Sequence, residues 1–186
     1  MQDILTNLST YGYLILFLYS LGGGMVAIIG AGLLSFEGNM NLTLSIIIAA
    51  VANFIGDMIL VYMGRYNKSS VMPYFKSHKR KLALAQILFK KYGDKIIFIK
   101  KYIYGLKTLV PLAIGLTKYS LIKFTIINAI CSVIWAISLG LASYYAGGFI
   151  SKFASYFGDH SYLVPLFLFI LLGLIWLYFS WATKKR

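Results

Sequence analysis

Long runs of apolar residues separated by short polar stretches dominate this chain. Three of them, residues 41–64, 120–147 and 161–183, reach the roughly 20 residues that a helix needs to cross a bilayer. The first run carries Asp57 as its one charged residue, and the third carries none. The pattern predicts an all-α integral membrane protein with about three spanning helices.

A fourth apolar run, residues 98–118, is interrupted. It contains Lys107 near its middle, Gly105 and Gly115 as helix breakers, and Pro111, which removes one backbone hydrogen bond from a helix. Irregular backbone at membrane depth is tolerated only where it is buried in protein or lines a wet cavity. Residues 98–118 are therefore predicted to form a re-entrant hairpin that enters and leaves on the same side.

A weak internal repeat relates the two halves of the chain at an offset of 83 residues. Each half has an apolar segment broken by glycine, then a spanning helix. On this basis residues 21–40 form a first re-entrant hairpin, opposed to the second in an inverted repeat, and the two tips meet inside the membrane. Residues 1–20 form either an interfacial or a spanning helix. The matched positions are Gly32 with Gly115, Tyr62 with Tyr145, and Gly64 with Gly147.

Composition and charge agree with a single membrane domain over residues 1–186. The chain is 60% hydrophobic and 17% aromatic, with a mean hydropathy of +0.78, well above an ordinary soluble domain. The net charge of +13 comes from clusters in short polar segments, which indicates the cytoplasmic side of a membrane and not a nucleic-acid partner. Residues 65–97 are thus a basic cytoplasmic connector, and the basic tail Lys184, Lys185 and Arg186 places the C-terminus in the cytoplasm.

Two charged residues at membrane depth are the first candidates for function. Lys107 in hydrocarbon costs about 2.5 to 3.5 kcal/mol on insertion scales, which favours contact with an anionic ligand; the alternative is that its ammonium reaches the interface. Asp57 is a functional candidate by the same reasoning, or else forms a structural ion pair with Lys101 or Lys107. Lys101 is either a ligand contact or an interface anchor.

Other polar positions have simpler interpretations. Asn53 lies one turn before Asp57 on the same helix face, and Arg65 is typical of a topology anchor at the cytoplasmic end. His78 and His160 are far apart in the sequence, so no metal site is predicted. A stripe of small and polar residues at i, i+4 spacing indicates helix packing: Asn128, Ser132, Ala136 and Gly140.

These segments resemble a known family. Residues 101–115, KYIYGLKTLVPLAIG, are similar to the R-F-x-P-G-x-R-T-x-x-P-x-x-A-G signature of the DedA family, the bacterial branch of the VTT or SNARE-associated superfamily. Gly56-Asp57, Tyr62 and Gly64-Arg65 resemble its G-D-x-x-x-Y-x-x-G-R pattern. The resemblance implies a cell inner (plasma) membrane protein with two opposed re-entrant hairpins that moves phospholipids or polyprenyl-phosphate carriers such as undecaprenyl phosphate.

The residues and the resemblance together give the candidate site. Asp57, the only acid in a predicted span, is the proton-coupling candidate, supported by Asn53 and Arg65. Lys101 and Lys107 stand where the family usually has arginines. A lysine keeps the positive charge but cannot form the two parallel hydrogen bonds by which a guanidinium binds phosphate. Met25 stands where the family has a glutamate, which favours weak or absent proton coupling. The implied substrate-binding residues are Lys101, Gly105, Lys107, Thr108 and Pro111.

The leading functional hypothesis is a flippase or scramblase that binds the phosphate headgroup of a phospholipid or polyprenyl phosphate at the hairpin tips, without a cofactor. The alternative is a proton-coupled small-cation antiporter that uses Asp57. A lipid phosphatase would need a nucleophile and a general acid, usually His or Asp in clustered motifs, and neither histidine of this chain lies near Asp57 or the hairpins in the sequence. A scaffold that binds anionic lipid through residues 76–95 would not need Lys107. The sequence therefore favours a transporter and not an enzyme; oligomeric state stays open.

The predicted topology can be tested by cysteine labelling in a Cys131→Ser background. Lys90→Cys and Lys118→Cys should both be protected from impermeant reagents added outside, because both ends of the second hairpin are predicted to be cytoplasmic. Ser155→Cys should label. External labelling of Lys118→Cys would contradict a hairpin that returns to the same side.

Overall fold

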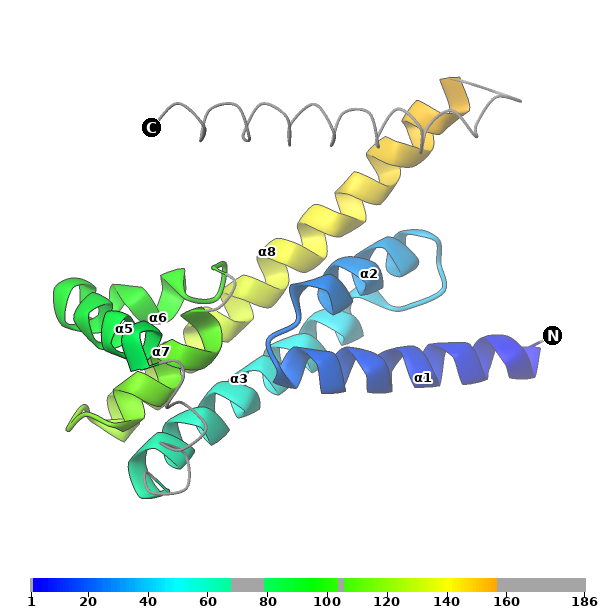
Figure 1. The fold of residues 1–186 in the computed structure, drawn as a ribbon. Helices are drawn as coiled ribbons and strands as arrows, with labels where there is room; N and C mark the ends of the chain where they lie inside the picture. The colour runs from blue at the N-terminus through cyan, green and yellow to red at the C-terminus, as the bar shows by residue number, and fades with distance from the viewer. Residues whose placement is uncertain (1, 68–78, 104–105, 157–186) are drawn as a thin grey trace. The chain divides into compact units, whose positions relative to one another are not determined.

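The computed structural model describes residues 2–67, 79–103 and 106–156, and every regular element within them is an α-helix. The elements are α1 (Gln2–Leu21), α2 (Met25–Phe36), α3 (Leu42–Tyr66), α5 (Lys79–Tyr92), α6 (Lys95–Ile99), α7 (Leu106–Gly115) and α8 (Leu121–Tyr156) (Figure 1). The predicted third spanning segment, residues 161–183, lies outside the described residues.

Two helices in the described part are long and apolar enough to cross a membrane. They are α3 and the stretch Leu121–Lys152 of α8, with mean hydropathies of 2.2 and 2.0. Only 44% and 39% of their most apolar windows are buried, so apolar side chains such as Ile59 and Ile126 remain on the outside. The core helix of a soluble protein would be mostly buried, so this exposure indicates contact with lipid. Helix α8 continues to Tyr156, beyond the expected end at residue 147.

The first pair of short helices is built differently from the expected hairpin over residues 21–40. Residues Met25–Phe36 are one continuous helix, α2, and the turn lies at residues 22–24, so α1 is the other arm. Gly23 adopts φ +73°, and the N–H groups of Gly23 and Gly24 donate to the carbonyls of Ser20 and Tyr19. A left-handed residue in the turn favours glycine, so the glycine run fixes where the chain reverses.

The second pair of short helices is α6 and α7, which flank residues 100–105. Helix α7 continues through Pro111, which lies within it and is buried. Gly105 lies outside the described residues. The segment expected as a connector, residues 65–97, contains α5 and the first three residues of α6, and Ala85, Ile96 and Ile97 are buried in the apolar cluster around α7. Part of this basic segment therefore packs into the helical domain.

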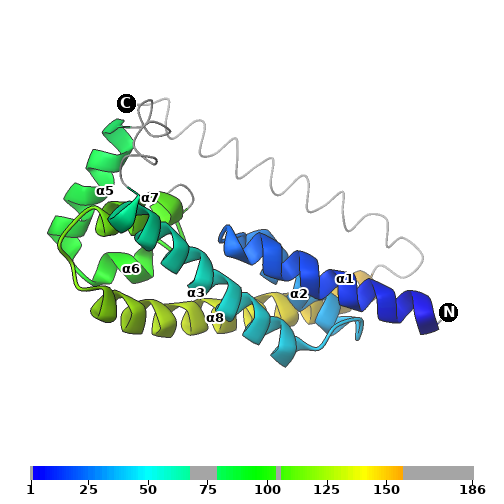
Figure 2. The ribbon, with the colours of Figure 1, turned by 90° about the horizontal axis from the view of Figure 1, so that it is seen from below.

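Glycines allow both pairs of short helices to pack closely against α3 (Figure 2). A Cβ added to Gly56 would lie 1.9 Å from the carbonyl oxygen of Leu21 at the end of α1. A Cβ on Gly64 would lie 2.5 Å from the carbonyl oxygen of Leu112 in α7, and one on Gly115 would lie 2.3 Å from that of Val61. Backbone thus approaches backbone at two points of α3, and any larger residue would separate the helices.

The matched glycines of the repeat are both contact positions. Gly115 lies in α7 and packs against α3, as described above. Gly32 lies in α2, and a Cβ there would be 1.9 Å from Ser143 Oγ and 2.9 Å from the carbonyl oxygen of Gly140, both in α8. The second short helix of each half therefore contacts the long helix of the other half.

Two apolar clusters stabilise the fold, one around each pair of short helices. The first cluster includes Leu16, Ile28, Ala49 and Trp135. The second, around α7, includes residues from α3, α5, α6, α7 and α8. Along α3 and α8, buried polar residues lie between the two clusters: Asn53, Asp57, Asn128 and Ser132.

A polar clamp holds the outer end of the second helix pair. The Arg65 Nε donates to the carbonyl oxygen of Gly115 at 3.0 Å, and its Nη2 donates to that of Tyr119 at 2.6 Å. The Tyr119 hydroxyl donates to Asp94 at 2.5 Å, and Lys123 forms an ion pair with the same carboxylate at 2.6 Å. The contacts with Lys123 and then Tyr119 hold the pKa of Asp94 below its usual range. Arg65 thus satisfies backbone carbonyls at the end of α7, which is a more specific role than the topology anchor predicted from the sequence.

The close contact at Gly56 gives a stability prediction. Gly56→Ala should destabilise the protein by about 1 to 3 kcal/mol, because the added methyl overlaps a backbone carbonyl that cannot rotate away. Gly30→Ala is the matched control, since a Cβ there would meet no atom within 4 Å. Thermal unfolding in detergent should show a lower Tm for Gly56→Ala alone. Equal Tm values for both variants would contradict this packing.

Candidate functional site

The buried polar layer is centred on Asp57, in the middle of α3. Its side chain is 8% exposed, and each carboxylate oxygen contacts a different ammonium group. Oδ1 lies 2.5 Å from Lys100 Nζ, and Oδ2 lies 2.8 Å from Lys101 Nζ. Asp57 therefore links α3 to the segment between α6 and α7 through two ion pairs.

Lys101 is held by three acceptors from two helices. Its Nζ donates to Asp57, to Asn53 Oδ1 at 2.5 Å and to Ser132 Oγ at 2.8 Å. The Ser132 hydroxyl in turn donates to Asn53 Oδ1 at 3.2 Å. An ammonium group has three N–H donors, so these contacts use its full capacity. Lys101 is fixed inside the protein and does not act as an interface anchor.

Lys100 is fully buried, with a relative exposure of 0%. It was not among the candidates chosen from the sequence. Adjacent residues on a regular helix point in different directions. Here the chain leaves α6 at Ile99, and both side chains reach the same carboxylate. The signal that could have found it was a pair of consecutive lysines at the start of an apolar run.

A small cavity lies beside this layer, where the turn of the first helix pair meets the beginning of α7. It has room for about one water molecule. The cationic residues that line it are Lys101 and Lys107, and Asp57 is its acidic one. The full lining is Leu21, Gly22, Gly23, Asn53, Asp57, Leu60, Lys101, Lys107 and Thr108.

Lys107 lies directly over the glycine turn. A Cβ on Gly23 would be 2.9 Å from its Cδ and 3.0 Å from its Nζ, and the Nζ atom is shielded from solvent. Gly23 therefore serves two purposes: its positive φ permits the turn, and its missing side chain makes space for the lysine. Nothing in the sequence connects this glycine with Lys107, which lies 84 residues later in the chain.

Two helices begin at this cavity. Helix α2 starts at Met25, directly after the turn, and α7 starts at Leu106, directly before Lys107. Neither has an acidic residue in its first turn. Because N–H groups at a helix start carry partial positive charge, both helix ends add to the positive potential of the lysines.

The structure brings together five of the predicted site residues: Asn53, Asp57, Lys101, Lys107 and Thr108 all line the cavity. The other described ones, Arg65 and Pro111, lie elsewhere, in the clamp and in the buried part of α7. Ser132, predicted to be a packing residue, instead binds Lys101, and Asn128 Nδ2 donates to the Phe54 carbonyl at 3.4 Å. In the described part of the chain, no three His, Cys, Asp or Glu residues come together as a metal site.

Comparison with known proteins places this arrangement in a family. The VTT domain model matches residues 5–145. The chain is 26% identical over 202 aligned positions to "Undecaprenyl phosphate transporter A" of Staphylococcus aureus (strain NCTC 8325 / PS 47), covering 100% of this chain and 98% of that protein. It is 25% identical over 159 positions to "Inner membrane protein YohD" of Escherichia coli (strain K12), covering 86% and 83%.

No solved structure matches the chain. The family match nevertheless extends over both pairs of short helices, α3 and the greater part of α8. It also confirms the family resemblance that the sequence motifs indicated. This protein is a member of the VTT domain family, among the DedA proteins.

Proposed function

We propose that this protein moves a polyprenyl phosphate across the cell membrane, as a flippase or scramblase, and that the phosphate binds at the cavity beside Asp57. The observation that carries the proposal is the convergence of Lys107, Lys101 and two helix starts on one cavity beside α3, a helix long and apolar enough to cross a membrane. Membership of the family and the name of the staphylococcal relative support the choice of a lipid phosphate.

The lengths of the apolar helices support re-entrant hairpins. The short apolar helices that follow the two turns are α2, Met25–Phe36, and α7, Leu106–Gly115. At 1.5 Å per residue these helices measure about 15 to 18 Å, or roughly half of a 30 Å hydrocarbon core. Each pair can therefore bring its turn to the membrane midplane, which is where substrate sites lie in transporters built from inverted repeats.

The charge of the site fits an anion. Lys100, Lys101 and Lys107 contribute three positive charges, and Asp57 offsets one of them. A phosphate that crosses hydrocarbon loses its hydration, which is costly. Ammonium groups and helix N-termini at the midplane would replace part of that hydration while the tail stays in the lipid.

The described conformation is closed, because the cavity holds about one water molecule and not a phosphate group. Transport therefore requires the glycine turn and the beginning of α7 to separate. Opening would expose Lys107 first, because its side chain lies against the turn. Lys101 would follow only after leaving some of its three acceptors.

The contacts of Asp57 do not favour the antiporter alternative. Each of its oxygens already contacts an ammonium group, so a small cation would have to displace a lysine. We infer that Asp57 mainly positions the lysines, and that transport is not coupled to protons through this residue.

Replacement of Lys107 tests the binding role. Lys107→Ala should abolish movement of polyprenyl phosphate in reconstituted vesicles, because the side chain nearest the glycine turn can no longer meet the headgroup. Lys107→Arg should retain or increase the rate, since a guanidinium can bind phosphate through two hydrogen bonds. Comparison with phosphatidylethanolamine, with and without a pH gradient, identifies the lipid and the driving force. Normal transport by a correctly inserted Lys107→Ala would disprove headgroup contact.

Replacement of Asp57 separates positioning from proton coupling. Asp57→Asn leaves two buried lysines without their counter-charge, and we expect it to lower the free energy of unfolding by about 3 to 5 kcal/mol and to abolish transport. Adding Lys100→Gln removes one of the excess charges and should recover part of the stability. The measurements are Tm in detergent and lipid movement in vesicles. A stable Asp57→Asn that still moves lipid downhill but ignores the pH gradient would support proton coupling instead.

A further inference from the structure

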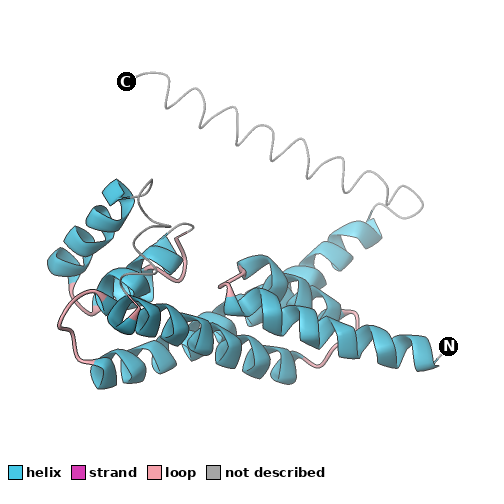
Figure 3. Ribbon diagram, turned by 60° about the horizontal axis from the view of Figure 1, so that its bottom comes forward, coloured by secondary structure: helices cyan, strands magenta, loops and turns pink. Residues whose placement is uncertain are grey.

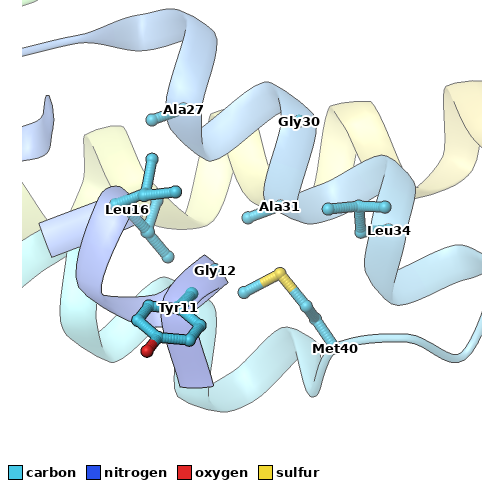
Figure 4. Close-up of a pocket in the computed structure, with 9 residues that line it drawn as sticks. Tyr11, Gly12, Leu16, Ala27, Gly30, Ala31, Leu34 and Met40 are labelled. Carbon is cyan, nitrogen blue, oxygen red and sulfur yellow. The ribbon is translucent and has the colours of Figure 1, made fainter. Parts of the chain in front are cut away.

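The two arms of the first helix pair, α1 and α2, pack against each other (Figure 3), and an apolar groove lies between them (Figure 4). Its volume is about 380 Å³. Met40, from the loop before α3, extends between the arms, and its Sδ would lie 3.5 Å from a Cβ on Gly12. The lining consists of Tyr11, Gly12, Ile15, Leu16, Ala27, Gly30, Ala31, Leu34 and Met40.

Small residues keep this groove open. Among the described residues, a Cβ built on Gly30 would meet no other atom within 4 Å, so these residues leave the space over this part of α2 unfilled. The lining is almost entirely apolar. Such a space beside apolar helices suits a hydrocarbon chain and excludes a headgroup, which would lose its hydration without gaining polar contacts.

The groove and the cationic cavity belong to the same helix pair. Gly23 lines the cavity, and Ala27, four residues later in the chain, lines the groove. Within α2, which begins at Met25, Ala27 and Leu34 lie about 10 Å apart at 1.5 Å per residue, so the groove follows the helix for about that length. A chain attached to a phosphate in the cavity would therefore reach the groove with its first carbons and could follow α2 to the loop before α3.

The volume of the groove favours a single hydrocarbon tail as its occupant. Pockets for small molecules measure about 300 to 1,000 Å³, and this groove lies near the lower end of that range. It is better suited to part of a single hydrocarbon tail than to the two tails of a phospholipid. A polyprenyl phosphate has one tail attached directly to its phosphate.

We propose that this groove binds the part of the polyprenyl tail nearest the phosphate, so that head and tail are recognised by the same helix pair. The inference rests on the proposed function. It adds a specificity-determining site. The cavity would recognise the phosphate group, and the groove would recognise the hydrocarbon tail attached to it.

Substitution at Gly30 tests the groove without altering the cavity. Gly30→Leu places a branched side chain in the open space, and it should not harm α2, because leucine has the higher helix propensity. Gly30→Ala is the control for helix propensity. Val26→Phe adds bulk to α2 at a position that is 73% exposed and does not line the groove. Tm values in detergent verify that all three variants fold.

The readout is photolabelling of the full-length protein in vesicles by a polyprenyl phosphate with a diazirine in its first isoprene units. We expect adducts within residues 11–16 and 27–34 of the unmodified protein. Gly30→Leu should give about tenfold fewer adducts, which corresponds to a loss of about 1.4 kcal/mol of binding free energy. The two control variants should give as many adducts as the unmodified protein. Lys107→Ala should also reduce labelling, because the headgroup would no longer hold the tail in place.

Two outcomes would overturn the tail site. One is equal labelling by a diazirine-bearing phosphatidylcholine, which would mean that the groove holds ordinary bilayer lipid. The other is a folded Gly30→Leu that is labelled and transports like the unmodified protein. If the proposed function is wrong, the unmodified protein will not transport polyprenyl phosphate. In that case the photolabelling result alone shows whether the groove binds the polyprenyl tail.

Discussion

The contact between Asp57 and two lysines determines how the rest of the structure is arranged. One carboxylate on α3 holds the segment between α6 and α7, and Lys101 extends the connection to Ser132 on α8. Burying these charges is costly unless each is paired and hydrogen-bonded. The segment between α6 and α7 can therefore occupy its place only when α3 and α8 are both correctly packed. The polar layer thus couples the packing of these helices and is also part of the candidate site.

Close backbone contacts complement this layer. Gly56 and Gly64 let the first and second helix pairs approach the same face of α3, one on each side of Asp57 in the sequence. In a membrane, where lipid competes equally for apolar side chains, such close packing and interhelical hydrogen bonds are the main sources of helix association. The glycines thus bring the lysines to hydrogen-bonding distance, and the lysines in turn make the close approach favourable.

The sequence was sufficient for α3 and α8, two of the three predicted spanning helices, and for the charged candidates, because apolar length and charges at membrane depth are local signals. Asp57, Lys101 and Lys107 could be chosen from them. The turn at Gly23 and the role of Lys100 could not, because both depend on how two distant segments meet. Arg65 shows the same limit: its position predicted an anchor, whereas its partners are the carbonyls of Gly115 and Tyr119, some 50 residues away in the chain. Hydropathy and motif spacing carry no information on such contacts.

The clamp around Tyr119 has a consequence for how the two halves are attached. Tyr119 accepts a hydrogen bond from Arg65 through its carbonyl and donates one to Asp94 through its hydroxyl, so a single residue joins the end of α3, the start of α6 and the approach to α8. The second helix pair is thereby held at its base as well as at its tip. The first helix pair is attached differently: the Tyr13 hydroxyl of α1 accepts a hydrogen bond from the Asn41 N–H just before α3, and the end of α1 packs on Gly56 through its backbone. The two halves of the repeat are therefore held in place by different kinds of interaction.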